Sequence, residues 1–242
     1  NGAVLWRATS RAKAFRTGAS MALIGHGTQR IVAYPISPPD ADGLSTMNWI
    51  AELKYDPADG WSKNDWNKAV DPSVFMPAFE DWCYDWLDFP ALVAGASDVL
   101  EYPMVDRDPL EQWSDGRATL MGDAAHATYP VGSNGASAAI MDARTLGAAF
   151  VEHGLTAKAL ETYEAKMRPL TTGLINANRG EGPDAILQWV EDQCGGEFDN
   201  IEAVIPRAEL AAHSAKYKRI AGFSVEELNR LDRTIAVGAR VG

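Results

Sequence analysis

The residues best suited to chemistry lie between Gly122 and Asn134, where the chain reads Gly-Asp-Ala-Ala-His-Ala-Thr-Tyr-Pro-Val-Gly-Ser-Asn. Asp123 follows an apolar run that ends at Met121, so we expect its carboxylate just beyond the end of a strand. There it can accept hydrogen bonds from the hydroxyl groups of a ribose or a ribityl chain. The small residues around Asp123, such as Ala124, leave space for a ligand to approach closely. This half of the segment therefore predicts a ligand-binding turn.

The other half of the segment, Pro130 to Gly135, is predicted to be a loop that opens into the first turn of a long helix. Amides at a helix N-terminus have no partner within the helix and carry a partial positive charge. They suit an oxygen or nitrogen atom that becomes negative during reaction. A flavin fits, because two-electron reduction places negative charge along its N1–C2=O edge. A phosphate would also fit, but the loop has no Lys and no G-x-x-x-x-G-K pattern, which excludes a P-loop.

His126 allows two interpretations. With Asp123 it could form a pair of metal ligands, but a metal site needs more ligands than two. No cluster of His or Cys completes such a site, and Cys83 and Cys194 do not have the spacing of metal ligands. We therefore expect no metal site, and we expect His126 to make a structural hydrogen bond in the loop.

Several other groups of residues leave alternatives open. His26, in Gly-His-Gly-Thr, either lines a substrate pocket or serves a turn. The charged triplet Asp106-Arg107-Asp108 is either a salt-bridged surface loop or an element beside the cofactor. An aromatic run could contact a planar substrate, although core packing is the commoner use of such side chains. Its members are Trp82, Tyr84, Trp86 and Phe89.

The elements that must position these residues follow from the apolar patterning. Short apolar or alternating runs separated by turn residues predict strands in the first third of the chain, and their turn-length separations favour an antiparallel sheet. Two further strands should flank a turn at Ser114-Asp115-Gly116. The predicted strands cover 4–7, 21–24, 30–35, 46–53, 100–105 and 117–121.

Helices are predicted from capping patterns and from helical apolar spacing. A capping box over 62–65 predicts a helix over 66–70, and Pro72 is expected to be the first residue of a helix that continues to about Trp82. The remaining predicted helices cover 133–150, 155–178 with a break or kink at Pro169, 183–193, 206–217 and 224–231.

Composition limits the classes of function. The 242 residues carry a formal net charge of −11 with a pI near 4.8, and no basic cluster suits nucleic acid. No apolar stretch is long enough to cross a bilayer, and an acidic surface is repelled by anionic lipid. Two cysteines exclude a disulfide framework and favour the cytoplasm, with a single disulfide left as an alternative. We expect neither a nucleic-acid nor a membrane partner.

The segment resembles the second FAD-binding motif of the class A flavin-dependent aromatic monooxygenases, which have the para-hydroxybenzoate hydroxylase fold. The resemblance rests on Gly122-Asp-Ala-Ala-His, on Pro130-x-Gly132 with Asn134, and on Asp142 in the following helix. Asn134 replaces a third glycine of the usual motif, a variant of a narrower subgroup. Strings at 14–18, 32–37, 102–110 and 217–223 are similar to the phenazine-modifying members of that subgroup.

This resemblance implies FAD as cofactor, NADPH or NADH as reductant, and O2 and a small aromatic ring as substrates. Asp123 would bond the ribityl or ribose hydroxyls, and the loop would lie along the isoalloxazine ring. No side chain would act as a nucleophile, because a flavin C4a-hydroperoxide supplies the reactive oxygen. Tyr34 and Tyr102 lie on strands that the family places toward the substrate, as His26 would. The implied cofactor-binding residues are Gly122, Asp123, Pro130, Val131, Gly132, Ser133 and Asn134.

One part of the family pattern is missing. The chain contains no G-x-G-x-x-G string for the FAD pyrophosphate, and Asn1-Gly2 leads directly into a strand-like run. We therefore expect an N-terminally truncated chain that is α+β as given, combining part of an α/β FAD-binding domain with an antiparallel substrate domain. The expected domains are 1–105 for substrate, 106–178 for the C-terminal part of the FAD-binding domain, and 179–242 as a helical segment.

The sequence supports three functions. The first is an FAD-dependent monooxygenase of an aromatic or phenazine-like ring, or a C-terminal fragment of one. The second is a non-catalytic remnant that cannot hold FAD alone. The third is a flavin-dependent oxidase or reductase that inserts no oxygen. The missing N-terminal part, or a second copy of the chain, is the expected macromolecular partner.

Overall fold

The computed structural model describes residues 2–55, 68–180, 182, 184–220, 229 and 233–241. The chain divides into two compact units, residues 1–104 and residues 105–242. The first boundary falls beside the one expected after residue 105. The further division expected after residue 178, and the roles of the domains, stay predictions.

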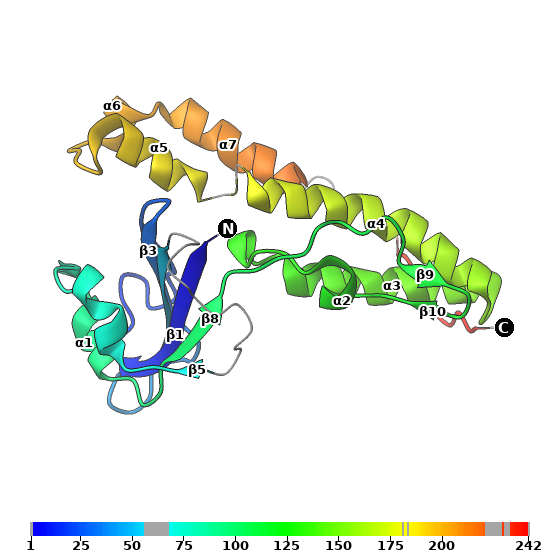
Figure 1. Ribbon diagram of the computed structural model, residues 1–242, viewed down its shortest axis with the longest axis horizontal. Helices are drawn as coiled ribbons and strands as arrows, with labels where there is room; N and C mark the ends of the chain where they lie inside the picture. Colours follow the sequence, from blue (N-terminus) through cyan, green and yellow to red (C-terminus); the bar gives the residue numbers. More distant parts are fainter. Residues whose placement is uncertain are drawn as a thin grey trace. The chain divides into compact units, whose positions relative to one another are not determined.

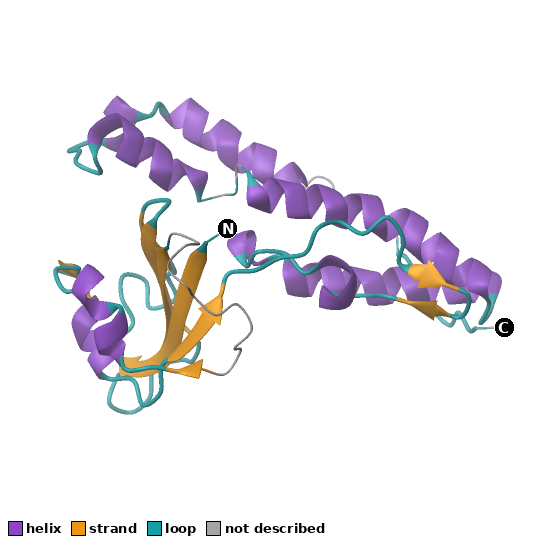
Figure 2. Cartoon of the chain, viewed as in Figure 1, coloured by secondary structure: helices purple, strands orange, loops and turns teal. Residues whose placement is uncertain are grey.

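The first unit is built on an antiparallel six-stranded sheet with the strand order β2-β3-β4-β1-β8-β5. Figure 1 labels β1, β3, β5 and β8 of this sheet, and Figure 2 draws the strands in orange. The predicted strands and their antiparallel pairing are confirmed. The long central pair, β1 and β4, aligns from Ala3↔Lys54 to Ala12↔Ser45. The strands are β1 (Ala3–Ala12), β2 (Ala22–Gly25), β3 (Gln29–Pro35), β4 (Ser45–Lys54), β5 (Lys68–Ala69) and β8 (Leu100–Pro103).

One face of this sheet carries an aromatic core. Side chains alternate along β1, so that Trp6 is buried while Arg7 is exposed. Trp49 of β4 is fully buried, and its Nε1 donates to Ser10 Oγ at 2.9 Å. Helix α1 (Phe89–Ala94), capped by the Asp88 side chain, packs on β1 through Phe89 and its neighbours. The core fixes which residues face the opposite side of the sheet.

Two predictions for the segment 66–82 are wrong. Residues 72–82 form two short 3-10 helices, Pro72–Val74 and Met76–Ala78, in place of one α-helix. Pro77 explains the difference, because its ring would clash with the carbonyl four residues earlier in an α-helix. Lys68–Ala69, expected to be helical, is strand β5 and pairs with β8, where Lys68 Nζ lies 2.7 Å from Glu101 Oε1. The proposed capping box at 62–65 lies outside the described residues.

The second unit is mainly helical. The long helices α3 (Gly135–His153) and α4 (Ala157–Arg179) lie side by side (Figure 1) and enclose a small core that includes Trp113 and Tyr163. Their predicted positions are confirmed; α4 continues through Pro169, which excludes a break there, and the alternative of a kink stays a prediction. The other elements are β9 (Ser114–Asp115), β10 (Ala118–Thr119), α2 (Asp123–His126), α5 (Ala185–Cys194), α6 (Ile201–Val204) and α7 (Arg207–Ile220).

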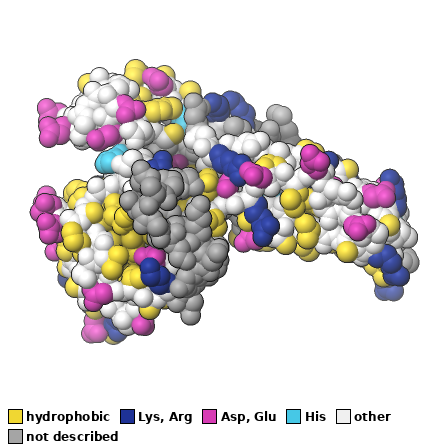
Figure 3. All heavy atoms as spheres, in the orientation of Figure 1, with side chains coloured by type: hydrophobic (Ala, Val, Ile, Leu, Met, Phe, Trp, Pro, Cys, Tyr) yellow, Lys and Arg dark blue, Asp and Glu magenta, His cyan; other side chains and the backbone are white. Residues whose placement is uncertain are grey.

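Two smaller strands, β6 (Cys83–Tyr84) and β7 (Leu87–Asp88), form a hairpin in the first unit. Cys83 and Cys194 are both free thiols. Acidic side chains are scattered over the face seen in Figure 3 and do not gather in one patch. Within the described ranges no helix is long and apolar enough to cross a membrane. The helix expected over 224–231 lies almost entirely outside those ranges.

Candidate functional site

A buried carboxylate organises the turn that carries Asp123. The chain leaves β10 and turns at Gly122, whose φ of 57° is the left-handed conformation that favours glycine. Asp142 of α3 reaches this turn: its Oδ2 accepts from the Gly122 amide at 2.7 Å and lies 2.6 Å from His126 Nε2. Gly122, which precedes α2, and His126, its last residue, therefore both contact Asp142 Oδ2.

This arrangement is completely enclosed. Asp142 is 0% exposed and His126 is 2% exposed, so both polar groups need partners inside the fold. Tyr163 and Trp113 line the same core, and the Tyr163 hydroxyl donates to the Leu120 carbonyl at 3.2 Å. Burial, and then the nearby Asp142 carboxylate, raise the pKa of Tyr163. The structural hydrogen bond predicted for His126 is confirmed, with Asp142 as its partner.

Asp123 itself is exposed at the first position of α2. Its side chain bonds to no other residue in the part of the chain that the structure describes. The turn is therefore held by Asp142 and His126, while the Asp123 carboxylate stays available to a ligand. A binding turn needs such an arrangement, in which Asp142 and His126 hold the backbone and Asp123 is left to contact the ligand.

The Pro130–Asn134 loop lies between α2 and α3 and includes a 3-10 turn at Val131–Ser133. Gly132 has a φ of 74°, and a Cβ atom built there would lie 1.8 Å from Tyr217 Oη of α7. Any other residue here would be strained at this φ and would require Tyr217 to move. Asn134 is buried, and its Nδ2 donates to the same Tyr217 hydroxyl.

The N-terminus of α3 presents free donors beside this loop. The first hydrogen bond of the helix runs from the Ala138 amide to the Asn134 carbonyl at 2.9 Å, so the amides of residues 135–137 precede the helical pattern. Asn134 makes no side-chain cap, and its Oδ1 is buried without a partner among the described residues. Free amides, a helix dipole and an unused acceptor fit the ring system of a flavin, which needs both donors and acceptors.

Two residues that the sequence did not single out for the site complete it. Asn178 of α4 accepts from the Tyr217 hydroxyl at 3.0 Å and donates to Thr128 Oγ1 at 2.9 Å. Burial raises the pKa of Tyr217, which keeps its hydroxyl protonated and able to donate. Tyr217 belonged to a string with a family resemblance, whereas no sequence signal identified Asn178.

The charged triplet 106–108 is salt-bridged, as one of its two interpretations proposed. Arg179, at the end of α4, contacts Asp106 at 2.5 Å and Asp108 at 2.8 Å. The Arg107 amide donates to the Ala127 carbonyl at 3.0 Å, which ties the triplet to the end of α2. A position beside the cofactor stays a prediction for these residues.

The three proposed substrate residues are spread over the first unit. Tyr34 and Tyr102 lie on the sheet face opposite the aromatic core, where Tyr102 pairs with Leu5, and Tyr34 lies in the same row as Thr9. These rows are separated by about 13 Å along the strands. His26 lies in the β2–β3 turn, where its Nδ1 lies 3.1 Å from Thr28 Oγ1. The structure does not bring the three together, and their substrate role stays a prediction.

The aromatic run contributes mainly to the core of the first unit. Phe89 is fully buried, and Trp82 and Trp86 pack against the same cluster. Tyr84 is 39% exposed and stacks on Trp86 with ring centroids 5.8 Å apart. Core packing, the interpretation favoured from the sequence, is confirmed for Phe89, Trp82 and Trp86.

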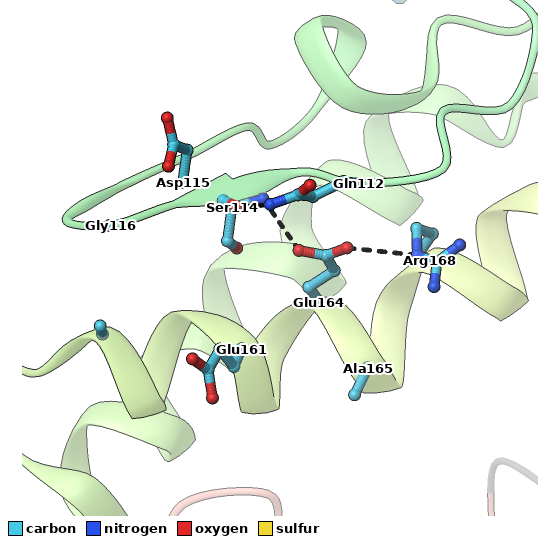
Figure 4. A pocket seen from close by; sticks show the side chains of 9 residues that line it. Gln112, Ser114, Asp115, Gly116, Glu161, Glu164, Ala165 and Arg168 are labelled. Atoms are coloured by element: carbon cyan, nitrogen blue, oxygen red, sulfur yellow. Dashed lines mark hydrogen bonds and ion pairs between the residues drawn. The ribbon is translucent and has the colours of Figure 1, made fainter.

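Two surface hollows lie away from the predicted site. One, of about 380 Å³, lies between the β9–β10 hairpin and α4, where Glu164 accepts from the Ser114 amide and contacts Arg168 (Figure 4). The other, of about 600 Å³, is lined by residues 17–19 and 35–39. Over the described residues, no group of three or more His, Cys, Asp or Glu is placed to hold a metal ion.

Comparison with known proteins points to one family. A family model described as an FAD binding domain matches residues 96–178, which include the Asp142 and His126 arrangement and the loop. The chain is 42% identical over 177 residues to phenazine 1,6-dicarboxylic acid hydroxylase PhzS of Lysobacter antibioticus, covering 72% of this chain and 44% of that protein. Residues 96–178 thus match an FAD-binding domain, and the chain is similar to FAD-dependent aromatic hydroxylases. FAD is the cofactor of this family.

Further relatives agree. The chain is 42% identical over 125 residues to 6-hydroxynicotinate 3-monooxygenase of Bordetella bronchiseptica, covering 51% of this chain and 30% of the relative. Its fold is similar to Klebsiella pneumoniae HpxO complexed with FAD and uric acid, with a TM-score of 0.59 at 19% identity over 94% of this chain and 50% of that one. A salicylate hydroxylase substrate complex gives a TM-score of 0.57 at 17% identity over 91% of this chain and 56% of that chain. The fold is therefore that of the para-hydroxybenzoate hydroxylase-like enzymes. The chain spans less than half the length of the curated relatives it matches.

Proposed function

We propose that this chain forms the ring-facing part of the flavin site of an FAD-dependent monooxygenase, together with the sheet that faces its aromatic substrate. One observation carries the proposal. The Asp142 carboxylate fixes both ends of α2 from inside the fold, at 2.7 Å from the Gly122 amide and 2.6 Å from His126, while Asp123 remains exposed and unpartnered among the described residues. The Asp123 carboxylate is thereby left available to a ligand while other groups hold the turn.

Each part of the segment has a role toward FAD. Asp123 accepts hydrogen bonds from the ribityl or ribose hydroxyls. The loop of Pro130, Val131, Gly132, Ser133 and Asn134 would lie along the isoalloxazine ring, and the first amides of α3 would stabilise the negative charge that the ring gains on reduction.

When bound, FAD would supply the redox chemistry: reduction by NADPH or NADH and activation of O2, so that one oxygen atom would enter the aromatic ring and the other would leave as water. In balance, an aromatic C–H, O2, the reduced nicotinamide and a proton give the phenol, water and the oxidised nicotinamide. This chain's residues orient the groups and exclude water; none of them needs to attack the substrate. The buried Asp142 and His126 hold the turn and touch no substrate.

The substrate that we propose is a carboxylated phenazine or a smaller aromatic acid. The relative from Lysobacter antibioticus acts, by its name, on phenazine 1,6-dicarboxylic acid, and others act, by their names, on hydroxylated or aminated single rings. Tyr34 and Tyr102 would contact the ring from the sheet, with His26 at its margin. Arg7 lies on the same face as both tyrosines, where its Nε donates to Asn48 Oδ1 at 3.0 Å, and it would attract a substrate carboxylate.

A macromolecular partner is part of the proposal. Large apolar side chains are exposed around β10 and α3, and a further segment that carries the pyrophosphate motif would cover them. In this proposal the segment would come from the missing N-terminal part or from a second copy of the chain. The exposed residues are Leu120, Met121, Ile140 and Met141, which are 37%, 38%, 62% and 38% exposed.

The decisive assay follows reduced nicotinamide, oxygen and product together. With phenazine-1,6-dicarboxylate, FAD and NADPH or NADH, we expect substrate-stimulated oxidation of the nicotinamide and one hydroxylated product for each nicotinamide consumed. Hydrogen peroxide without hydroxylated product would instead establish the oxidase or reductase alternative. A protein that stays colourless with added FAD and consumes no nicotinamide would establish the non-catalytic remnant.

A further inference from the structure

Tyr217 lies where the C-terminal helix α7 meets the loop in front of α3. Its hydroxyl accepts from Asn134 Nδ2 and donates to Asn178 Oδ1 at 3.0 Å. All three side chains are at least nine-tenths buried, with Tyr217 7% exposed and Asn134 2% exposed. The phenol is therefore fixed from both sides, and it fixes the Asn134 amide in turn.

Asn134 stands at a position where asparagine usually caps a helix, but its side chain does not do so. It is the N-cap residue of α3, and asparagine is among the residues that best cap a helix, by accepting from the second or third amide. Those amides belong to Ala136 and Ser137. Yet Asn134 makes no such bond, and its backbone, at φ −95° and ψ −14°, is not extended as in capping residues. Its side chain is turned toward Tyr217.

Tyr217 packs tightly against the loop and is itself held by α4. The phenol oxygen lies so close to Gly132 that any Cβ there would overlap it. Asn178 holds the phenol from the α4 side and also donates to Thr128 and to the Tyr129 carbonyl, at 2.9 and 3.4 Å. Tyr217 thus joins both ends of the loop to the helices behind it.

We propose that Tyr217 is a positioning residue that prevents Asn134 from capping α3, and so keeps the first amides of this helix open for the flavin. This inference rests on the proposed function. The exposed N-terminus of α3 would otherwise be satisfied by its own asparagine, which would compete with the bound ring. A residue with no capping side chain at position 134 would need no such restraint, whereas Asn134 does.

The test uses four forms of the full chain: wild type, Tyr217→Phe, Asn134→Gly and the double variant. Amide exchange at Ala136 and Ser137 is measured by NMR without FAD. In Tyr217→Phe the freed asparagine caps α3, so these amides should exchange about fivefold to tenfold more slowly. In the double variant the exchange should equal that of Asn134→Gly. Tyr84→Phe, which removes an exposed phenol in the first unit, should change nothing.

FAD binding is the second measurement. The Kd for FAD should rise about tenfold in Tyr217→Phe and return, in the double variant, to within about twofold of the value for Asn134→Gly. A purely structural role for the phenol would give no such rescue. If Tyr217→Phe does not fold, amide exchange in Asn134→Gly decides alone: because Asn134 makes no side-chain cap in wild type, Ala136 and Ser137 should exchange within about twofold of their wild-type rates.

Unchanged or faster exchange of Ala136 and Ser137 in a folded Tyr217→Phe variant would overturn the inference. So would exchange of the same two amides that is much faster in Asn134→Gly than in wild type, because it would show that Asn134 already caps α3. If the wild-type chain does not bind FAD while the exchange result is as expected, the proposed function fails and the role of Tyr217 in holding Asn134 stands.

Discussion

Asp142 Oδ2 lies 2.6 Å from His126 Nε2, across a sequence separation of sixteen residues, and the same oxygen accepts from the Gly122 amide. One atom of α3 thereby fixes the start and the end of the helix that presents Asp123. Because both side chains are enclosed, removing either leaves a buried polar group without its partner.

Replacement of Asp142 by alanine should therefore be costly. We expect Asp142→Ala to lower the free energy of unfolding by about 3–5 kcal/mol, since it leaves His126 and the Gly122 amide unpaired in the interior. Urea unfolding followed by circular dichroism measures this. Glu152→Ala, which removes a 60% exposed acid from the same helix, should cost less than about 0.5 kcal/mol. Equal losses in the two variants would contradict the assigned role of Asp142.

Gly132 in the loop can be compared with Gly173 in α4 as its control. Gly132→Ala forces a Cβ into the Tyr217 hydroxyl at a positive φ, and we expect a loss of stability of about 2 kcal/mol or more. Gly173→Ala, in an exposed turn of α4 with nothing within 4 Å of the new Cβ, should stabilise by about 0.5–1 kcal/mol. Thermal unfolding of both variants checks the signs. A neutral Gly132→Ala would mean that Tyr217 does not pack on the loop.

Asp123 should behave in the opposite way to Asp142. Because its side chain is exposed and has no partner in the described part of the chain, Asp123→Ala should leave the free energy of unfolding within about 0.5 kcal/mol of wild type. Asp115→Ala, at an exposed position in β9, is the surface control. A loss as large as that of Asp142→Ala would show that Asp123 holds the fold and is not reserved for a ligand.

The raised pKa of Tyr163 leads us to expect a loss of stability at alkaline pH. Its pKa is raised in the folded chain by burial and by the Asp142 carboxylate, whereas the unfolded chain ionises near pH 10.0. Above that pH the unfolded state releases a proton that the folded state keeps, so stability falls as pH rises, by about 1.4 kcal/mol per pH unit for one such group. The slope of unfolding free energy against pH above 10 should be smaller in Tyr163→Phe. An unchanged slope would show that Tyr163 does not contribute to the loss of stability at alkaline pH.

Much of this fold could be predicted from local patterns. The alternation along β1 and the helical spacing in α3 and α4 record which face each element buries, and both signals are strong in long elements. The segment 66–82 was mispredicted because a favourable first proline outweighed Pro77, which blocks α-helix, and because the pairing of Lys68 with Glu101 depends on a strand distant in sequence. Short helices such as α1 and α6 carry too few residues to show a period.

The site was found from its motif, but the partners within it were not. Asp142 and His126 were both named from the pattern, yet only the fold brings a helix residue to the turn sixteen positions earlier. Asn178 and Tyr217 contact the loop from α4 and α7, and no local spacing links them to it. Hydrogen bonds over such separations follow from packing and cannot be derived from periodicity.

The central claim is that these residues form the ring-facing part of an FAD site. The most direct measurement is the visible absorption spectrum of the chain during titration with FAD, for wild type beside Asp123→Ala. The account predicts a saturable change of the flavin bands in wild type and a Kd at least about tenfold higher in the variant, which loses charge-assisted hydrogen bonds. Spectra that remain those of free FAD at every wild-type concentration, or identical titrations for the two proteins, would contradict it.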